Sequence, residues 1–242
     1  MGRFDNTEGI ANRVMTLFFI VDTSGSMTGK KIGTVNTAIE SVIPEIRKIS
    51  DDNADAEIKI AAMEFSTGAR WISPQPSDAA DFKWRYLEAE GVTDFGKACE
   101  MLDEKLSRKT GFMNAAAGSF APVIILLSDG EPTDDYNKGL AQLRENSWFK
   151  HGLKFAIAIG DDANEDMLAE FTGNREAVVA VYTPLALAKL IKFVAVTSSQ
   201  IGSKSQDAAA ISSDFTKQDI LNNQIQEFTE TELEDADADD WD

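Results

Sequence analysis

Short apolar runs and amphipathic segments alternate along most of the chain. Nearly continuous apolar runs that end in turn residues are typical of strands buried on both faces of a sheet. Apolar positions at helical spacing follow most of these runs, as for Ile32, Val35, Ile39 and Val42. The predicted strands are residues 14–21, 57–65, 122–127, 153–159 and 178–181, and the predicted helices are residues 31–49, 95–106, 136–146, 165–171 and 184–196.

This alternation predicts an α/β fold with a doubly wound, mainly parallel sheet. Residues 69–72 follow the strand at 57–65 through Ser66-Thr67-Gly68, and we expect them to form one short antiparallel edge strand. Pro44 lies inside the first predicted helix and predicts a kink or an early end there.

The composition changes near the end of the chain. No Lys or Arg follows Lys217, and residues 227–242 hold nine carboxylates. Such a block of like charge is not expected to fold alone. We therefore predict an N-terminal extension at residues 1–13, one domain at residues 14–200 and an acidic, disordered tail at residues 201–242.

One feature of the predicted tail favours a role beyond solubility. Leu221, Ile225 and Phe228 recur at helical spacing and would form an apolar stripe if a partner covered them. The alternative is a tail that only keeps the protein soluble.

Charge and cysteine content narrow the function classes. The formal net charge of −18 disfavours nucleic acid and anionic membranes as partners. Residues 1–13 contain no apolar segment of signal-peptide length, and no stretch reaches the ~20 apolar residues of a membrane span. With a single cysteine, no internal disulfide can form, so we expect a cytoplasmic protein.

Polar residues gather where predicted strands end. Asp22, Ser24 and Ser26 follow the first strand, Thr93 precedes the helix at 95–106, and Asp129 follows the strand at 122–127. Carboxyl ends of parallel strands share one edge, where open α/β sheets bind ligands. Carboxylate and hydroxyl oxygens suit a hard cation such as Mg²⁺, with Mn²⁺ as the alternative. Taken singly, these residues could instead cap helices or form turns.

Several kinds of catalytic site fit the sequence poorly. The segment 25–31 is one residue short of a phosphate-binding Walker loop, and the position two residues after Asp22 is Ser24 rather than a second carboxylate. Cys99 lies on the apolar face of a predicted helix and is expected to pack in the hydrophobic core. The only histidine, His151, is expected in a solvated loop. A nucleophile paired with a histidine base is therefore hard to build.

Three motifs resemble those of a known family. Asp22-x-Ser24-x-Ser26, Gly91-x-Thr93-x-x-Gly96-x-Ala98 and Leu127-Ser128-Asp129-Gly130 resemble the three loops of the von Willebrand factor type A (VWA) domain, which form a metal-ion-dependent adhesion site in that family. The resemblance runs from about residue 14 to 196. Residues 22–27 and 129–135 are similar to the bacterial cytosolic tellurium-resistance (TerY-like) group. Some members of that group carry a Cys-rich zinc module, which this chain lacks.

The resemblance implies roles for the five oxygen donors. Ser24 and Ser26 would ligate Mg²⁺ directly, Asp22 and Asp129 would act largely through bound waters, and Thr93 would ligate directly or through water. One coordination position would remain for an Asp or Glu of a protein partner.

The resemblance also implies a function. It indicates a non-enzymatic, Mg²⁺-dependent protein-interaction module in a bacterial stress-response or phage-defence system, where a kinase or phosphatase encoded nearby is a candidate partner. The alternative is a metal-dependent phosphohydrolase acting on a phosphate ester, which the lack of a His or Lys acid/base in the motif loops disfavours.

Overall fold

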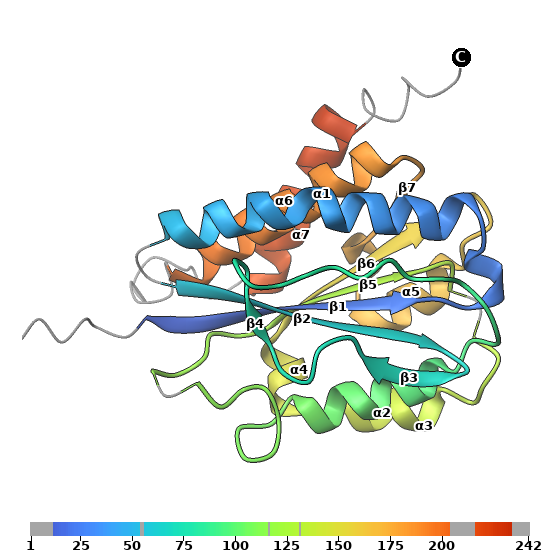
Figure 1. Ribbon diagram of the computed structural model, residues 1–242, viewed down its shortest axis with the longest axis horizontal. Coiled ribbons are helices and arrows are strands. Elements are labelled where there is room, and N and C mark those ends of the chain that lie inside the picture. Colours follow the sequence, from blue (N-terminus) through green and yellow to red (C-terminus); the bar gives the residue numbers. More distant parts are fainter. Residues whose placement is uncertain (1–11, 54–55, 116, 131, 204–215, 234–242) are drawn as a thin grey trace, which may run out of the picture.

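The computed structural model describes residues 12–53, 56–115, 117–130, 132–203 and 216–233. A central sheet lies between two layers of helices (Figure 1). The strands are β1 (Arg13–Asp22), β2 (Ala56–Ser66), β3 (Gly68–Trp71), β4 (Ser77–Asp78), β5 (Val123–Ser128), β6 (Leu153–Ile159) and β7 (Val178–Val181). The chain therefore alternates between strands and helices as its sequence predicts.

The sheet is mainly parallel, and its strand order places β1 near the middle. Six strands lie in the order β3-β2-β1-β5-β6-β7, and β4 pairs with β2. β1, β2, β5, β6 and β7 run parallel, whereas β3 and β4 run antiparallel to β2. This confirms the doubly wound fold and the antiparallel strand after β2, and it adds the very short β4.

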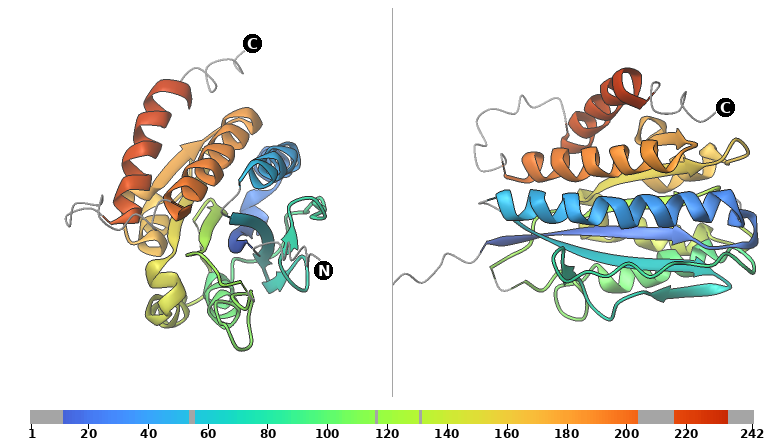
Figure 2. Two further views of the ribbon diagram at one scale, coloured as in Figure 1. Left: turned by 90° about the vertical axis from the view of Figure 1, so that its left-hand side faces the viewer. Right: turned by 45° about the horizontal axis from the view of Figure 1, so that its top comes forward.

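Helices cover both faces of this sheet. The α-helices are α1 (Lys30–Asp52), α2 (Phe95–Lys105), α3 (Asn137–Glu145), α4 (Ser147–His151), α5 (Glu165–Thr172), α6 (Pro184–Ser203) and α7 (Lys217–Phe228), and the shorter turns are η1 (Gly25–Met27), η2 (Arg175–Ala177) and η4 (Thr229–Leu233). Buried residues of α1, α6 and α7 share one hydrophobic core, and those of α2, α3, α4 and α5 share another. α1, α6 and α7 follow one another across their face (Figure 2).

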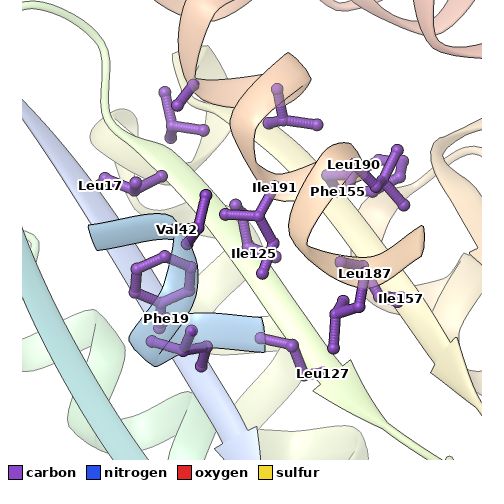
Figure 3. Packing of buried hydrophobic residues seen from close by; sticks show 14 of the residues in the cluster. Leu17, Phe19, Val42, Ile125, Leu127, Phe155, Ile157, Leu187, Leu190 and Ile191 are labelled. Atoms are coloured by element: carbon purple, nitrogen blue, oxygen red, sulfur yellow. The ribbon is translucent and has the colours of Figure 1, made fainter. Parts of the chain in front are cut away.

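The first strand contributes side chains to both cores, because successive residues of a strand point to opposite faces. Leu17 and Phe19 pack under α1 and α6, as Figure 3 shows, while Phe18 packs on the opposite side. All three side chains are fully buried. The continuous apolar run thus forms the centre of the sheet and carries Asp22 to its carboxyl edge.

Pro44 does not end the first helix, so the predicted early end is wrong. α1 continues through this residue from Lys30 to Asp52. Pro44 is exposed, whereas Val42 and Ile46 beside it are buried in the core. The packing of these neighbours outweighs the one backbone hydrogen bond that proline cannot donate.

The end of the chain also differs from expectation. Residues 217–233, predicted to belong to an unfolded tail, form α7 and η4. Leu221 and Ile225 are fully buried in the core shared with α1 and α6, and the Phe228 ring stacks on Phe193 with 4.2 Å between ring centroids. The apolar stripe is therefore covered by the protein's own domain, and residues 204–215 and 234–242 of the predicted tail lie outside the described residues.

Polar contacts fix α7 at its first turn. Thr216 and Asp219 form a capping box, and the Gln218 side chain accepts a hydrogen bond from the Lys154 backbone N–H and donates one to its C=O, both at 2.8 Å. Lys154 lies in β6 before the stretch that pairs with β7. Gln218 thus replaces the strand partner that β6 lacks there.

Within the described ranges, one helix is long and apolar enough to cross a membrane, namely α6, over Pro184–Ile201 with a mean hydropathy of 1.2. Its Leu187, Leu190 and Ile191 side chains are fully buried against the sheet (Figure 3). In this fold α6 is a core helix.

Candidate metal centre

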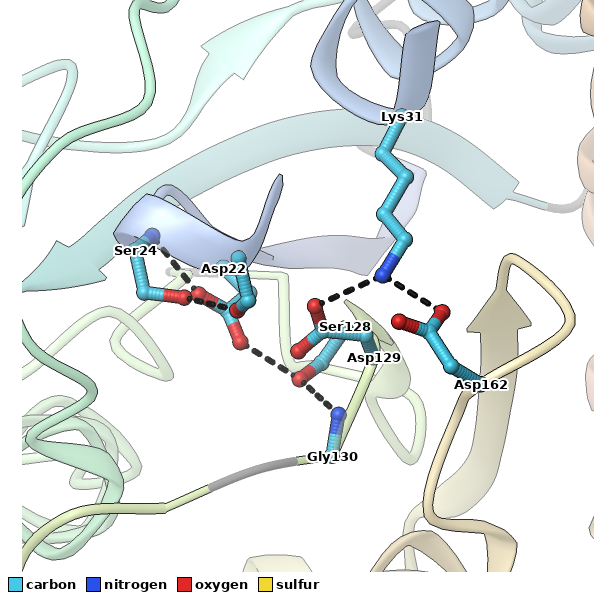
Figure 4. Close-up of polar contacts among 8 residues, drawn as sticks. Asp22, Ser24, Lys31, Ser128, Asp129, Gly130 and Asp162 are labelled. Carbon is cyan, nitrogen blue, oxygen red and sulfur yellow. Dashed lines mark hydrogen bonds and ion pairs between the residues drawn. The ribbon is translucent and has the colours of Figure 1, made fainter. Parts of the chain in front are cut away.

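The Asp22 carboxylate lies at the end of β1 and is held from two sides. Its Oδ1 accepts a hydrogen bond from the Ser24 backbone N–H at 2.8 Å, and its Oδ2 accepts one from the Ser128 hydroxyl at 2.6 Å (Figure 4). Asp22 is fully buried. Burial raises the pKa of Asp22 above its usual value, the two serines oppose this shift, and the nearby charge of Asp129 adds to it. A cation beside Asp22 would favour its ionised form.

Ser24 and Ser26 present their hydroxyls together beside this carboxylate. The two Oγ atoms are 3.0 Å apart, and Ser24 is 1% exposed. In an octahedral site with metal–oxygen distances of about 2.1 Å, adjacent ligands lie about 3.0 Å apart. The two hydroxyls hydrogen-bond each other in this structure, and the same spacing fits neighbouring ligands of one Mg²⁺-sized ion.

The loop that carries Thr93 is tied to the loop after β1. The Gly25 N–H donates to the Gly91 C=O at 3.0 Å, and the Glu90 N–H donates to the Thr23 C=O at 2.8 Å. An added Cβ at Gly25 would lie 3.2 Å from the Gly91 oxygen, so a larger residue would push the two loops apart.

Thr93 itself is buried at the same edge. Its backbone N–H donates to the Thr133 hydroxyl at 2.9 Å, its C=O accepts from the Thr133 N–H at 2.9 Å, and the residue is 3% exposed. These contacts link the Thr93 loop to the loop after β5.

Asp129 follows β5 and carries the most distinctive atom of the site. The residue is 1% exposed, and its Oδ1 is buried without a hydrogen-bond partner among the described residues. Such an oxygen costs free energy unless a cation or water satisfies it. Together with the paired hydroxyls of Ser24 and Ser26, this oxygen fits a hard cation at the carboxyl edge.

The donors are a mixed set of carboxylates and hydroxyls. Across the described ranges, no cluster of three or more His, Cys, Asp or Glu residues could hold a metal ion by itself. A metal centre here therefore depends on the serine and threonine hydroxyls as much as on Asp22 and Asp129.

Ser128 is a residue whose role the sequence did not reveal. Its hydroxyl donates to Asp22 and accepts from the Gly130 N–H at 2.8 Å. One side chain thus joins the loops after β1 and β5. Its motif position was visible, but the direction of its hydroxyl required the structure.

Lys31 is a second residue that the sequence analysis missed. It lies in the first turn of α1, and its Nζ is 3.1 Å from Asp129 Oδ2 and 2.7 Å from Asp162 Oδ1. The burial of Lys31 lowers its pKa, but its hydrogen bonds to Asp162 and Asp129 outweigh this effect and raise the pKa. The available sequence signal is a lysine at a helix N-terminus, where the helix dipole disfavours a cation that has no anionic partner.

The cysteine and the histidine lie away from this site. Cys99 is 1% exposed in α2, as its sequence pattern predicts, and burial raises the pKa of its thiol. His151 ends α4 directly before β6, at the amino end of that strand, rather than lying in a loop as expected. Cys99 is thus a buried core residue, and His151 lies at the end of β6 opposite to the carboxyl edge.

The fold and the site together define an open α/β domain with a candidate cation site on three loops at one edge of its sheet. Residues 16–193 match the family described as the von Willebrand factor type A domain. The chain belongs to this family, whose domains commonly act as protein-interaction modules and bind a divalent metal at a metal-ion-dependent adhesion site.

Curated relatives share sequence with this domain but are much longer. The chain is 27% identical to the human inter-alpha-trypsin inhibitor heavy chain H2 over an alignment of 193 residues, which covers 72% of this chain and 18% of that protein. The mouse protein of the same name is 27% identical over an alignment of 181 residues, which covers 67% of this chain and 17% of that protein.

Solved structures of low sequence identity share the fold. A von Willebrand factor type A protein from Catenulispora acidiphila matches with a TM-score of 0.56 and 20% identity over 77% of this chain and 43% of that one. The D319A mutant of the PilB minor pilin from Streptococcus sanguinis matches with a TM-score of 0.57 and 16% identity. The match covers 82% of this chain and 64% of that one. Proximal thread matrix protein 1 from the mussel byssus matches with a TM-score of 0.54 and 14% identity, over 77% of this chain and 48% of that one. Its adhesion-site motif is occupied by zinc.

Proposed function

We propose that this protein is a Mg²⁺-dependent, non-enzymatic interaction module whose metal accepts an Asp or Glu side chain from a protein partner. The observation that carries this proposal is the buried, unpartnered Oδ1 of Asp129 at the edge where the Ser24 and Ser26 hydroxyls lie 3.0 Å apart. A cation held there mainly by neutral oxygens keeps much of its positive charge and can attract a carboxylate.

The proposed ligand roles follow the geometry and the family resemblance. Ser24 and Ser26 would bind the ion directly, Asp22 and Asp129 would hold its waters, and Thr93 would bind directly or through water. Ser128 would orient Asp22 through their 2.6 Å hydrogen bond, because groups behind the ligands fix ligand direction.

We assign Mg²⁺, with Mn²⁺ as the alternative, because the donors are all oxygens. The mussel relative carries zinc at its motif, but protein zinc sites usually include nitrogen or sulfur ligands. The five proposed donors here offer neither.

A phosphohydrolase remains the weaker candidate. Lys31 lies beside Asp129, so a lysine does reach the site, contrary to the expectation from the motif loops. Its raised pKa keeps it protonated, however, and it cannot serve as a general base near neutral pH.

The narrower biological setting is proposed on the motifs alone. The similarity of residues 22–27 and 129–135 to the TerY-like group supports a role in bacterial stress response, tellurium resistance or phage defence, with a neighbouring kinase or phosphatase as partner. A single cysteine, buried in α2, supports a cytoplasmic location.

The proposed function is tested by selecting binders from a displayed peptide library on the immobilised protein in Mg²⁺. We expect enriched peptides to share an Asp or Glu and to be released by EDTA. Ser24→Ala should lose these peptides, whereas Ser41→Ala, the same change on the exposed side of α1, should keep them. Peptides without acidic residues that bind equally in EDTA would contradict the proposal.

A further inference from the structure

Lys31 connects the candidate metal centre to a loop on the far side of β5. Its ammonium bridges buried Asp129, at 3.1 Å, and Asp162, whose side chain is 74% exposed, at 2.7 Å (Figure 4). The Lys31 side chain itself is only 18% exposed. This lysine is therefore largely shielded from solvent and contacts both carboxylates at once.

The loop after β6 is shaped to receive this side chain. Gly160 has a φ of +95°, and a Cβ at this position would lie 2.6 Å from Lys31 Cε. The positive φ favours glycine at this position, because other residues would strain the backbone. A side chain at this position would displace the end of Lys31 from between the two carboxylates.

The charges at the site explain what the ammonium does. Asp22 and Asp129 are both buried and repel each other, as the effect of Asp129 on the pKa of Asp22 indicates. Lys31 supplies one positive charge to this pair. A divalent cation would supply two, so the ion and the ammonium compete for Asp129.

We propose that Lys31 is a tethered counter-cation that neutralises Asp129 in the metal-free protein and moves toward Asp162 when a divalent cation enters. This inference rests on the proposed metal site and adds to it a residue that sets its affinity. Competition with the ammonium weakens metal binding, and in the loaded site Lys31 stays paired with Asp162.

The test measures Mn²⁺ binding, with the metal alone as the probe, from loss of the free-ion electron paramagnetic resonance signal. Lys31→Met should lower the Mn²⁺ dissociation constant about five- to tenfold, since a positive charge near the ion is removed. The matched control Lys30→Met removes the same charge from an exposed neighbouring position and should change it less than about twofold.

Asp162 provides a second variant that does not alter the buried site. Asp162→Asn leaves Asp129 as the anionic partner of the ammonium and should raise the dissociation constant about threefold. Asp162→Asn should change the logarithm of the Mn²⁺ dissociation constant less than half as much when Lys31 is already replaced by Met. The two side chains act together, so removing one reduces the effect of removing the other.

A measurement without metal distinguishes competition for Asp129 from a purely structural role, in which the Lys31 ion pairs only hold two loops together. In chelator, Lys31→Met should melt below the unaltered protein because Asp129 loses its counter-charge. A purely structural role predicts the same decrease in melting temperature, but with unchanged or weaker Mn²⁺ binding. That result would overturn the inference while leaving the proposed metal site intact. Absence of Mn²⁺ binding by the unaltered protein would overturn both.

Discussion

At the scale of single residues, hydrogen bonds between loops decide the geometry of the candidate metal centre. Asp22, Ser24 and Asp129 could be predicted from the sequence because each follows an apolar run that ends at one edge. Ser128 and Lys31 could not, because their partners lie 106 and 98 residues away and the sequence does not encode which way a hydroxyl or ammonium turns.

The role of Ser128 leads to a test that changes no proposed ligand. Ser128→Ala removes the donor to Asp22 and the acceptor of the Gly130 N–H. We expect about 1–3 kcal/mol less stability against urea in chelator, because both groups are left unpaired in a buried site.

The same variant should weaken Mg²⁺ binding at least about tenfold, as groups that orient metal ligands commonly do. Ser147→Ala, at the start of α4 near the opposite edge, is the matched control and should leave Mg²⁺ affinity unchanged. Equal metal affinity in Ser128→Ala would show that Asp22 needs no orientation from the β5 loop.

At the level of helices and strands, the apolar runs predicted the strands correctly, whereas the acidic composition wrongly predicted that residues 217–233 are unfolded. Continuous apolar runs identified β1, β5 and β6 because parallel central strands are covered on both faces. The acidic composition after Lys217 hid α7, although Leu221 and Ile225 show the helical period. A helix needs only one buried face, and carboxylates on its other face do not prevent packing.

The packed position of α7 gives an element-scale prediction. Leu221→Ala should cost about 2–5 kcal/mol of unfolding free energy, because it removes a fully buried side chain from the core shared with α1 and α6. Gln224→Ala, on the exposed side of the same helix, is the control and should change stability by less than about 0.5 kcal/mol. Urea unfolding measures both.

A small effect of Leu221→Ala would mean that α7 adds little to the fold. Truncation after residue 203 would then leave the melting temperature nearly unchanged, as an unfolded tail would predict. The structure predicts a clear decrease, since the truncation also removes the contacts of Gln218 with β6.

At the scale of the whole molecule, the parallel sheet is what assembles the site. β1 and β5 are adjacent and parallel, so Asp22 and Asp129 leave the sheet at the same edge. The Thr93 loop reaches this edge through backbone hydrogen bonds to the loop after β1. This convergence was predictable from the order of strands and helices, whereas the exact spacing of the oxygens was not.

We propose that a single divalent cation is held by Ser24, Ser26, Thr93, Asp22 and Asp129. The most direct measurement is calorimetric titration of the full chain with Mg²⁺. We predict one weak site that disappears in the Ser24→Ala/Ser26→Ala double variant and persists in Ser41→Ala, with all three proteins folded alike in chelator. Binding of Mg²⁺ with the same stoichiometry and affinity by the double variant would contradict the claim.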